Sequence, residues 1–265
     1  MSGQLYVWLV VFCGVLGLLI GSFLNVVVWR VPRGESIVSP PSHCPKCDTP
    51  IGPRDNIPVL SWLLLHGRCR HCKNPISARY PLVEALTGAL WAGLAAFFGP
   101  VAQLPAYLVF AAVGVALALI DLDVRRLPDV LTLPSYPVGI ALLGLASAVH
   151  HHAWPFERAL IGMAALFVFY YVVAFIQPKG MGFGDVKLSG VIGLHLAWLG
   201  WSELAVGAFA AFVVGAVVGV GLILFAGGGR KTKVPFGPFM LVGALIGIFL
   251  GGPIGSAYNS LTLGG

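Results

Sequence analysis

The sequence predicts an all-α polytopic membrane protein with about eight transmembrane helices and a small zinc-binding loop between the first and second. The mean hydropathy is +0.90. Of the 265 residues, 58% are apolar and only 10% are charged, whereas soluble domains carry about 25% charged residues. Four of the five cysteines lie as two CxxC pairs in one polar loop. The bilayer, rather than a soluble core, therefore sets the lengths of the helices.

Eight apolar stretches approach the ~20 residues that a crossing needs. They run over 5–28, 82–98, 104–120, 130–149, 158–176, 187–200, 203–226 and 235–252. The run 187–200 is the shortest of them. We expect a first transmembrane helix in 1–29, a cytoplasmic tetracysteine loop in 30–81 and a seven-helix membrane core in 82–265.

The basic residues orient these spans. With eight crossings, 15 of the 16 Lys and Arg fall on one side, and Arg158 alone falls on the other. The positive-inside rule then places that side in the cytoplasm and both termini outside. The net charge of +6 accordingly reports loop orientation and gives no indication of nucleic-acid binding. The 15 are eight in 30–81, with Arg125, Arg126, Lys179, Lys187, Arg230, Lys231 and Lys233.

The cysteine pairs predict a structural zinc site. Twenty-one residues separate the two pairs, a spacing typical of tetrahedral thiolate sites. A loop of about 50 residues has too little core to fold alone, and a metal can supply the missing stability. Unliganded thiols and a redox dithiol are the alternatives. The expected ligands are Cys44, Cys47, Cys69 and Cys72, with His43 and His71 as bystanders.

Acidic residues gather at the ends of two predicted spans. Asp121 ends the third span, and ionisable groups at such depth are candidates for function. Asp123 lies about 200° further around a continuing helix, so the two cannot face one site. Asp123 is otherwise expected to be a solvated partner of Arg125 or Arg126. Asp129, just before the fourth span, is expected to cap that helix, although it is also a candidate for substrate binding.

A second carboxylate follows a glycine-rich segment. Asp185 ends GMGFGD (180–185) on the same predicted side of the membrane as Asp121. A flexible turn with Asp185 as a helix N-cap is the alternative reading. If Asp121 and Asp185 meet, they can share a proton; one then activates water while the other protonates the scissile carbonyl oxygen. This arrangement predicts a water-activating peptidase.

Several further residues are candidates for catalysis or substrate binding. Glycines tolerate close approach of another chain, and Gly182 and Gly184 precede Asp185. Lys187 follows it within the same segment. Glu84 opens the second predicted span and either caps that helix or lines the cytoplasmic cavity.

The motifs together resemble the bacterial type IV prepilin peptidases, which are membrane aspartyl proteases of the GxGD type. The resemblance covers nearly the whole chain. It rests on the two CxxC pairs and on GSFLNVVVWRVP (21–32), SARYPLVE (77–84), IDLDVRRLPD (120–129), GMGFGDVK (180–187) and VPFGPF (234–239).

The resemblance implies an activity, cofactors and partners. It implies cleavage of the basic leader of prepilins or pseudopilins at the cytoplasmic face of the bacterial inner membrane. It also implies methylation of the new N-terminus with S-adenosylmethionine, at binding residues that the sequence does not identify. Asp121 and Asp185 are the implied catalytic pair, with Asp123 as the alternative to Asp121. The products would assemble into type IV pili or a type II secretion pseudopilus.

Two other functions compete with this interpretation. A polytopic transporter could use acidic residues to couple protons or cations, although such acids usually lie near the bilayer midplane. A membrane scaffold with a zinc loop for docking would need neither aspartate.

Overall fold

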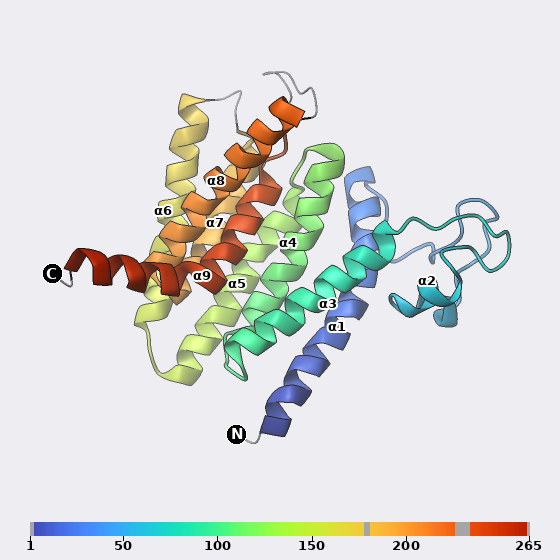
Figure 1. Ribbon diagram of the computed structural model, residues 1–265, viewed down its shortest axis with the longest axis horizontal. Helices are drawn as coiled ribbons and strands as arrows, with labels where there is room; N and C mark the ends of the chain where they lie inside the picture. The colour runs from blue at the N-terminus through green and yellow to red at the C-terminus, as the bar shows by residue number, and fades with distance from the viewer. Residues whose placement is uncertain (1–2, 178–180, 226–233, 264–265) are drawn as a thin grey trace. The chain divides into compact units, whose positions relative to one another are not determined.

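The computed structural model describes residues 3–177, 181–225 and 234–263, which are helical apart from turns and two isolated β-bridges. The chain divides into two compact units, Met1–Ala116 and Leu117–Gly265. The boundary lies within α4 (Leu104–Val124). The predicted all-α membrane class is therefore confirmed for the described residues (Figure 1).

In the first unit, α1 (Gly3–Arg30) and α3 (Arg79–Phe98) pack as an antiparallel pair. A Cβ on Gly21 would lie 2.7 Å from Cα of Glu84, so the backbones meet where only glycine fits. Nδ2 of Asn25 donates a hydrogen bond to the carbonyl of Tyr80 over 3.2 Å. The polar loop joins these helices and contains η1 (Val31–Arg33), η2 (Pro53–Asn56) and α2 (Leu60–Leu64).

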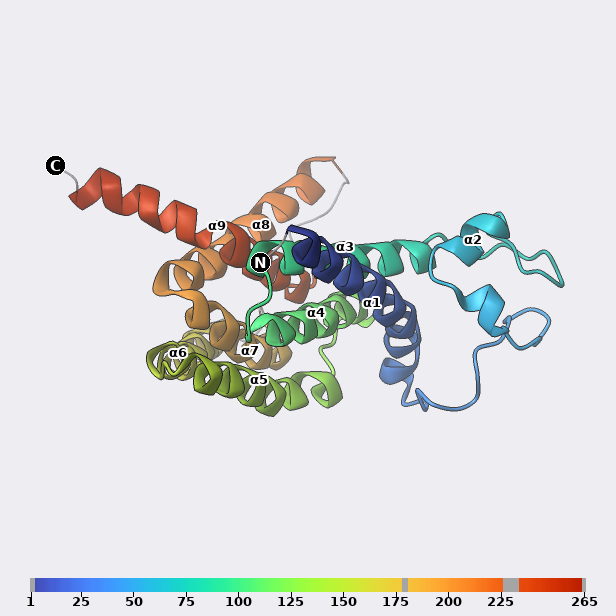
Figure 2. The same cartoon turned by 90° about the horizontal axis from the view of Figure 1, so that it is seen from below.

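In the second unit, one helix is enclosed by the others. It is α7 (Phe183–Leu199), whose residues are buried almost without interruption. It contacts α5 (Asp129–His150), α6 (Trp154–Ile176), α8 (Trp201–Phe225) and α9 (Gly237–Leu263). Figure 2 shows α7 between the neighbouring helices of this unit. The helix is therefore held from several sides from Asp185 onward, whereas Phe183 at its start is exposed.

Seven of the described helices are long and apolar enough to cross a membrane, namely α1, α3, α4, α5, α6, α8 and α9. The sixth expected span, 187–200, corresponds to α7, whose 17 residues rise only about 25 Å against a ~30 Å hydrocarbon core. Because α7 is surrounded by protein, its length need not match the lipid. The count of eight spans stays a prediction.

The end of α7 is closed by a side chain from the start of α6. The guanidinium of Arg158 donates to the carbonyls of Ala197, Trp198 and Leu199 over 2.6, 2.6 and 2.9 Å. These carbonyls have no partner within the helix itself. The one basic residue outside the predicted cytoplasmic set thus completes the central helix. Lys179, Arg230, Lys231 and Lys233 of that set lie outside the described residues, as does Gly180.

Candidate active site and metal cluster

Asp121 lies on the buried side of α4, near the end of the helix. The helix continues to Val124, so the helical register that separates Asp121 from Asp123 holds here. Asp121 is 5% exposed and Asp123 is exposed. Oδ2 of Asp121 accepts a hydrogen bond from the backbone N–H of Gly237, 3.1 Å away at the start of α9. The structure thus fixes Asp121 and leaves Asp123 at the surface.

Asp185 lies in the first turn of α7. The N-cap is Gly182, so the interpretation of Asp185 as the N-cap is wrong. Instead, Oδ2 of Asp185 reaches back to accept the N–H of Gly182 over 3.0 Å, as a carboxylate at the third helical position can do. The side chain is 8% exposed. Asp121 and Asp185 are thus both buried and both held by a backbone N–H, and their pairing in one site stays a prediction.

Leu127 connects the two aspartate segments. A Cβ on Gly184 would lie 3.0 Å from Cβ of Leu127. A Cβ on Gly237 would lie 3.3 Å from Cδ2 of Leu127 and 2.8 Å from Oδ2 of Asp121. The glycines therefore allow the starts of α7 and α9 to pack closely against Leu127, in the turn between α4 and α5.

The sequence analysis missed Gly237, Leu127 and Tyr170 as site residues. Tyr170 on α6 is buried and interacts electrostatically with Asp185. Its ring stacks on Phe212 with centroids 5.6 Å apart, and Phe236 lies 6.4 Å from it. Leu127 and Gly237 lie in the motifs 120–129 and 234–239, but neither motif indicates which helix the other one contacts.

Lys187 and Asp129 form an ion pair between the starts of α7 and α5. Nζ of Lys187 lies 2.7 and 2.8 Å from the two carboxylate oxygens, and the Tyr136 hydroxyl donates to the Lys187 carbonyl over 2.6 Å. The expected helix cap at Asp129 is wrong, because the N-cap is Pro128 and makes no side-chain capping bond. Asp129 instead ties its helix to the one that carries Asp185.

Of the two expectations for Glu84, the helix cap is wrong, and the lining of a cytoplasmic cavity stays a prediction. The helix α3 begins at Arg79, so Glu84 does not cap it. The side chain is 8% exposed, and Oε2 accepts the backbone N–H of Val59 over 2.7 Å. Glu84 therefore fastens the polar loop to α3 within the first unit.

The four cysteines form one cluster that can hold a metal ion. Their sulfur atoms all lie within 4.8 Å of one another. Each pair sits in a turn of the same design, with Cys44 N–H bonded to the Thr49 carbonyl and Cys69 N–H to the Asn74 carbonyl, at 3.0 and 2.9 Å. Of the described residues, neither His43 nor His71 belongs to the cluster.

The turns favour the thiolate form of two cysteines. Hydrogen bonds with the side chain and backbone of Thr49 lower the pKa of Cys47 to about 6. Backbone N–H groups of Cys72 and His71 lower the pKa of Cys69. Thiolate is the form that binds metal.

Comparison with known proteins assigns both halves of the chain. The model of the bacterial peptidase A24 N-terminal domain matches residues 15–98, and that of the type IV leader peptidase family matches residues 108–220. These matches cover both the cysteine cluster and the two aspartates. No solved structure was found to match the chain.

Curated relatives agree with the family models. The prepilin leader peptidase/N-methyltransferase of Aeromonas hydrophila is 39% identical over 89% of this chain and 89% of its own. The proteins of the same name from Stutzerimonas stutzeri and Pseudomonas aeruginosa are 35% and 34% identical; they cover 92% and 94% of this chain, and 91% and 93% of their own. The match thus spans nearly the full length, and this multi-pass membrane protein belongs to the type IV leader peptidase family.

Proposed function

We propose that this protein is a prepilin peptidase and N-methyltransferase that cuts the leader from prepilins or pseudopilins with Asp121 and Asp185. One observation carries the proposal for the site. Two buried carboxylates from different helices are each held by a backbone N–H, and Leu127 lies beside Gly184 and Gly237, which flank them. The name shared by the relatives supports the reaction, and nothing in the family supports a transporter.

The geometry suits activation of water without a covalent intermediate. The backbone N–H of Gly237 holds Oδ2 of Asp121, and the backbone N–H of Gly182 holds Oδ2 of Asp185. Within the described part of the chain, Oδ1 of each carboxylate makes no hydrogen bond, so it can exchange a proton. The ionised member takes a proton from water, and the protonated member donates to the carbonyl oxygen of the scissile bond. The buried setting strengthens both interactions.

The position of the pair suits a substrate that is itself anchored in the membrane. Asp121 lies three residues before the end of α4, and Asp185 two residues after the start of α7. With the orientation given by the positive-inside rule, both lie at the cytoplasmic boundary. A prepilin with its apolar helix in the bilayer and a basic leader in the cytoplasm presents the bond at this depth. The negative carboxylates at this boundary attract the positively charged leader electrostatically.

Methylation of the new N-terminus is the second proposed activity. The relatives' shared name supports it, and S-adenosylmethionine is the proposed methyl donor. Within the described residues, no set of side chains is assigned to this cofactor. Mass spectrometry of pilin matured by the purified protein with S-adenosylmethionine tests this activity, and an unmethylated N-terminus contradicts it.

Zinc is the proposed metal of the cysteine cluster. Tetrahedral zinc with sulfur ligands at ~2.3 Å places the sulfurs about 3.8 Å apart. Sγ of Cys44 and Sγ of Cys72 are 3.7 Å apart, which fits. Bound zinc would hold the two cysteine turns together and stabilise the loop. The purified protein should contain about one zinc ion per chain; a Cys13→Ser variant, whose thiol lies in α1, should retain it.

The aspartates are tested by cleavage of a prepilin in proteoliposomes. We expect Asp121→Asn and Asp185→Asn to abolish cleavage while thermal stability stays close to that of the wild type. Asp123→Asn is the matched control, because Asp123 is exposed one half-turn away, and it should cut normally. Loss of activity in Asp123→Asn with retention in Asp121→Asn would overturn the assignment. Activity in all three would overturn the aspartyl mechanism.

A further inference from the structure

The short helix α2 presents an apolar face to the outside of the loop. Leu60, Leu63 and Leu64 are 57%, 56% and 77% exposed. They occupy positions i, i+3 and i+4, so they lie on one side of the helix. We refer to these three side chains as the leucine face. Clustered leucines of this kind mark a surface that contacts something other than water.

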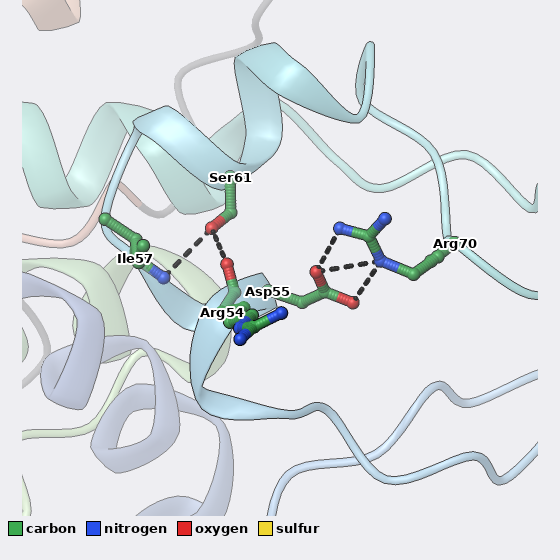
Figure 3. Close-up of polar contacts among 5 residues, drawn as sticks. All are labelled: Arg54, Asp55, Ile57, Ser61 and Arg70. Atoms are coloured by element: carbon green, nitrogen blue, oxygen red, sulfur yellow. Dashed lines mark hydrogen bonds and ion pairs between the residues drawn. The ribbon is translucent and has the colours of Figure 1, made fainter.

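The opposite side of α2 is fastened to the rest of the loop. The Ser61 hydroxyl accepts the Ile57 N–H and donates to the Arg54 carbonyl, both over 2.9 Å (Figure 3). Nε1 of Trp62 donates to the Ile76 carbonyl over 3.0 Å. The leucine face is therefore held outward by specific contacts of its neighbours.

The turn before α2 is also bonded to a membrane helix, which sets its depth. Val59, directly before Leu60, donates its N–H to the buried carboxylate of Glu84 at 2.7 Å. Glu84 lies five residues after the start of α3 at Arg79, about 7.5 Å along the helix, and α3 is a candidate membrane span. The start of α2 thus lies level with the end of a span rather than far out in solvent.

The charge around α2 suits the headgroups of a bilayer. Arg54 precedes it, and Arg68 and Arg70 follow it, all exposed. The guanidinium of Arg70 is paired with Asp55 over 2.6 Å (Figure 3), so we count only the charges of Arg54 and Arg68 toward this surface. Residues 30–81 carry eight Lys or Arg against three Asp or Glu. An apolar face flanked by basic residues is typical of helices that lie in the membrane interface, and anionic lipids attract such flanks.

We propose that the leucine face of α2 inserts into the lipid interface and seats the cysteine loop on the membrane surface. The occupant is the bilayer, because both ends of the loop join membrane helices and Glu84 holds α2 at their level. The inference does not depend on the peptidase or methyltransferase activity. It adds a lipid-binding surface to a loop whose other feature is its metal cluster.

The test measures the depth of position 64 in the full chain in nanodiscs that contain anionic lipid. A nitroxide is attached through a ketone-bearing amino acid at Leu64, so that the cysteines remain untouched. Its collisions with oxygen, which enriches in lipid, are compared with those of a water-soluble nickel complex. We expect oxygen to dominate, at a depth of about 5–10 Å below the headgroup boundary. The same label at exposed Lys46 should report water.

Three outcomes separate the possible occupants. If the nitroxide at position 64 collides with the nickel complex as often as the nitroxide at position 46 does, the leucine face lies in water and the proposal is overturned. Protection of position 64 from both reagents would place it against protein, and would also overturn it. Glu84→Ala should move the label toward water, whereas Glu35→Ala, an exposed acid of the same loop, should not. An unchanged depth in Glu84→Ala would contradict the anchoring role.

Discussion

The backbone N–H of Gly237 lies 3.1 Å from Oδ2 of Asp121, so the first residue of α9 holds a carboxylate near the end of α4. A hydrogen bond from a backbone N–H stabilises the ionised form of a carboxylate. Gly237 also lies so close to the Asp121 carboxylate that a larger side chain at position 237 would not fit between them. The position of Asp121 in the proposed catalytic pair therefore depends on a glycine 116 residues away in sequence.

Replacing Gly237 by alanine should impair cleavage without unfolding the protein. The new Cβ would lie 2.8 Å from Oδ2 of Asp121, so the carboxylate must shift. A shift of about 1 Å in a reacting group can cost about 100-fold in rate, and we expect a fall of this order in kcat for prepilin cleavage. Gly219→Ala is the control, since nothing lies within 4 Å of a Cβ there. Equal activity in both variants would show that the Gly237 contact is unimportant.

The membrane fold could be predicted from the sequence because lipid imposes simple rules on it. Hydropathy alone located all eight long apolar segments, and each contains a helix in the structure. Helical register also separated Asp121 from Asp123, because a residue two positions on must face away. Both are local properties of one helix, and local properties can be read from a sequence.

The contacts that position the site could not be predicted in the same way. The bond between Gly237 and Asp121 joins two helices, and the sequence carries no signal for which helix lies next to which. The hydrogen-bond partner of Glu84 could not be predicted for a similar reason, since it is the N–H of Val59 in an irregular loop. The short length of α7 also becomes intelligible only once its burial among other helices is known.

The Lys187–Asp129 pair should couple the starts of α5 and α7. Both carboxylate oxygens contact Nζ within 2.8 Å, but Asp129 is half exposed, so the pair is worth only about 0.5–1 kcal/mol. Lys187→Met and Asp129→Asn should each lower thermal stability slightly. Their combination should cost no more than the larger single change, because both break one contact. Strictly additive losses would contradict direct coupling.

Removal of metal from the cysteine cluster should unfold the loop and leave the helices intact. The loop has little core besides the cluster, so we expect its order to depend on a bound metal. After chelation, trypsin should cut after the exposed Arg68 or Arg70 while helix content by circular dichroism stays constant. A Cys44→Ser variant should be cut without chelator. Cys13→Ser, which alters a buried thiol of α1, should resist trypsin like the wild type. If the loop still resists trypsin after loss of the metal has been verified, contacts other than the metal site fold it.

Val59 should gain from replacement by glycine. Its φ of 61° and ψ of −51° are unfavourable for a β-branched residue, and such conformations cost about 1–3 kcal/mol. Glycine adopts positive φ readily and keeps the N–H that Glu84 accepts. We expect Val59→Gly to raise the denaturant concentration at which the cluster cysteines react with a thiol reagent. Val38→Gly, at an exposed position of the same loop, adds chain entropy without relieving a positive φ, and should lower that concentration. If the cluster cysteines of Val59→Gly instead react at a lower denaturant concentration than those of the wild type, the packing of the valine side chain outweighs the strain of its backbone.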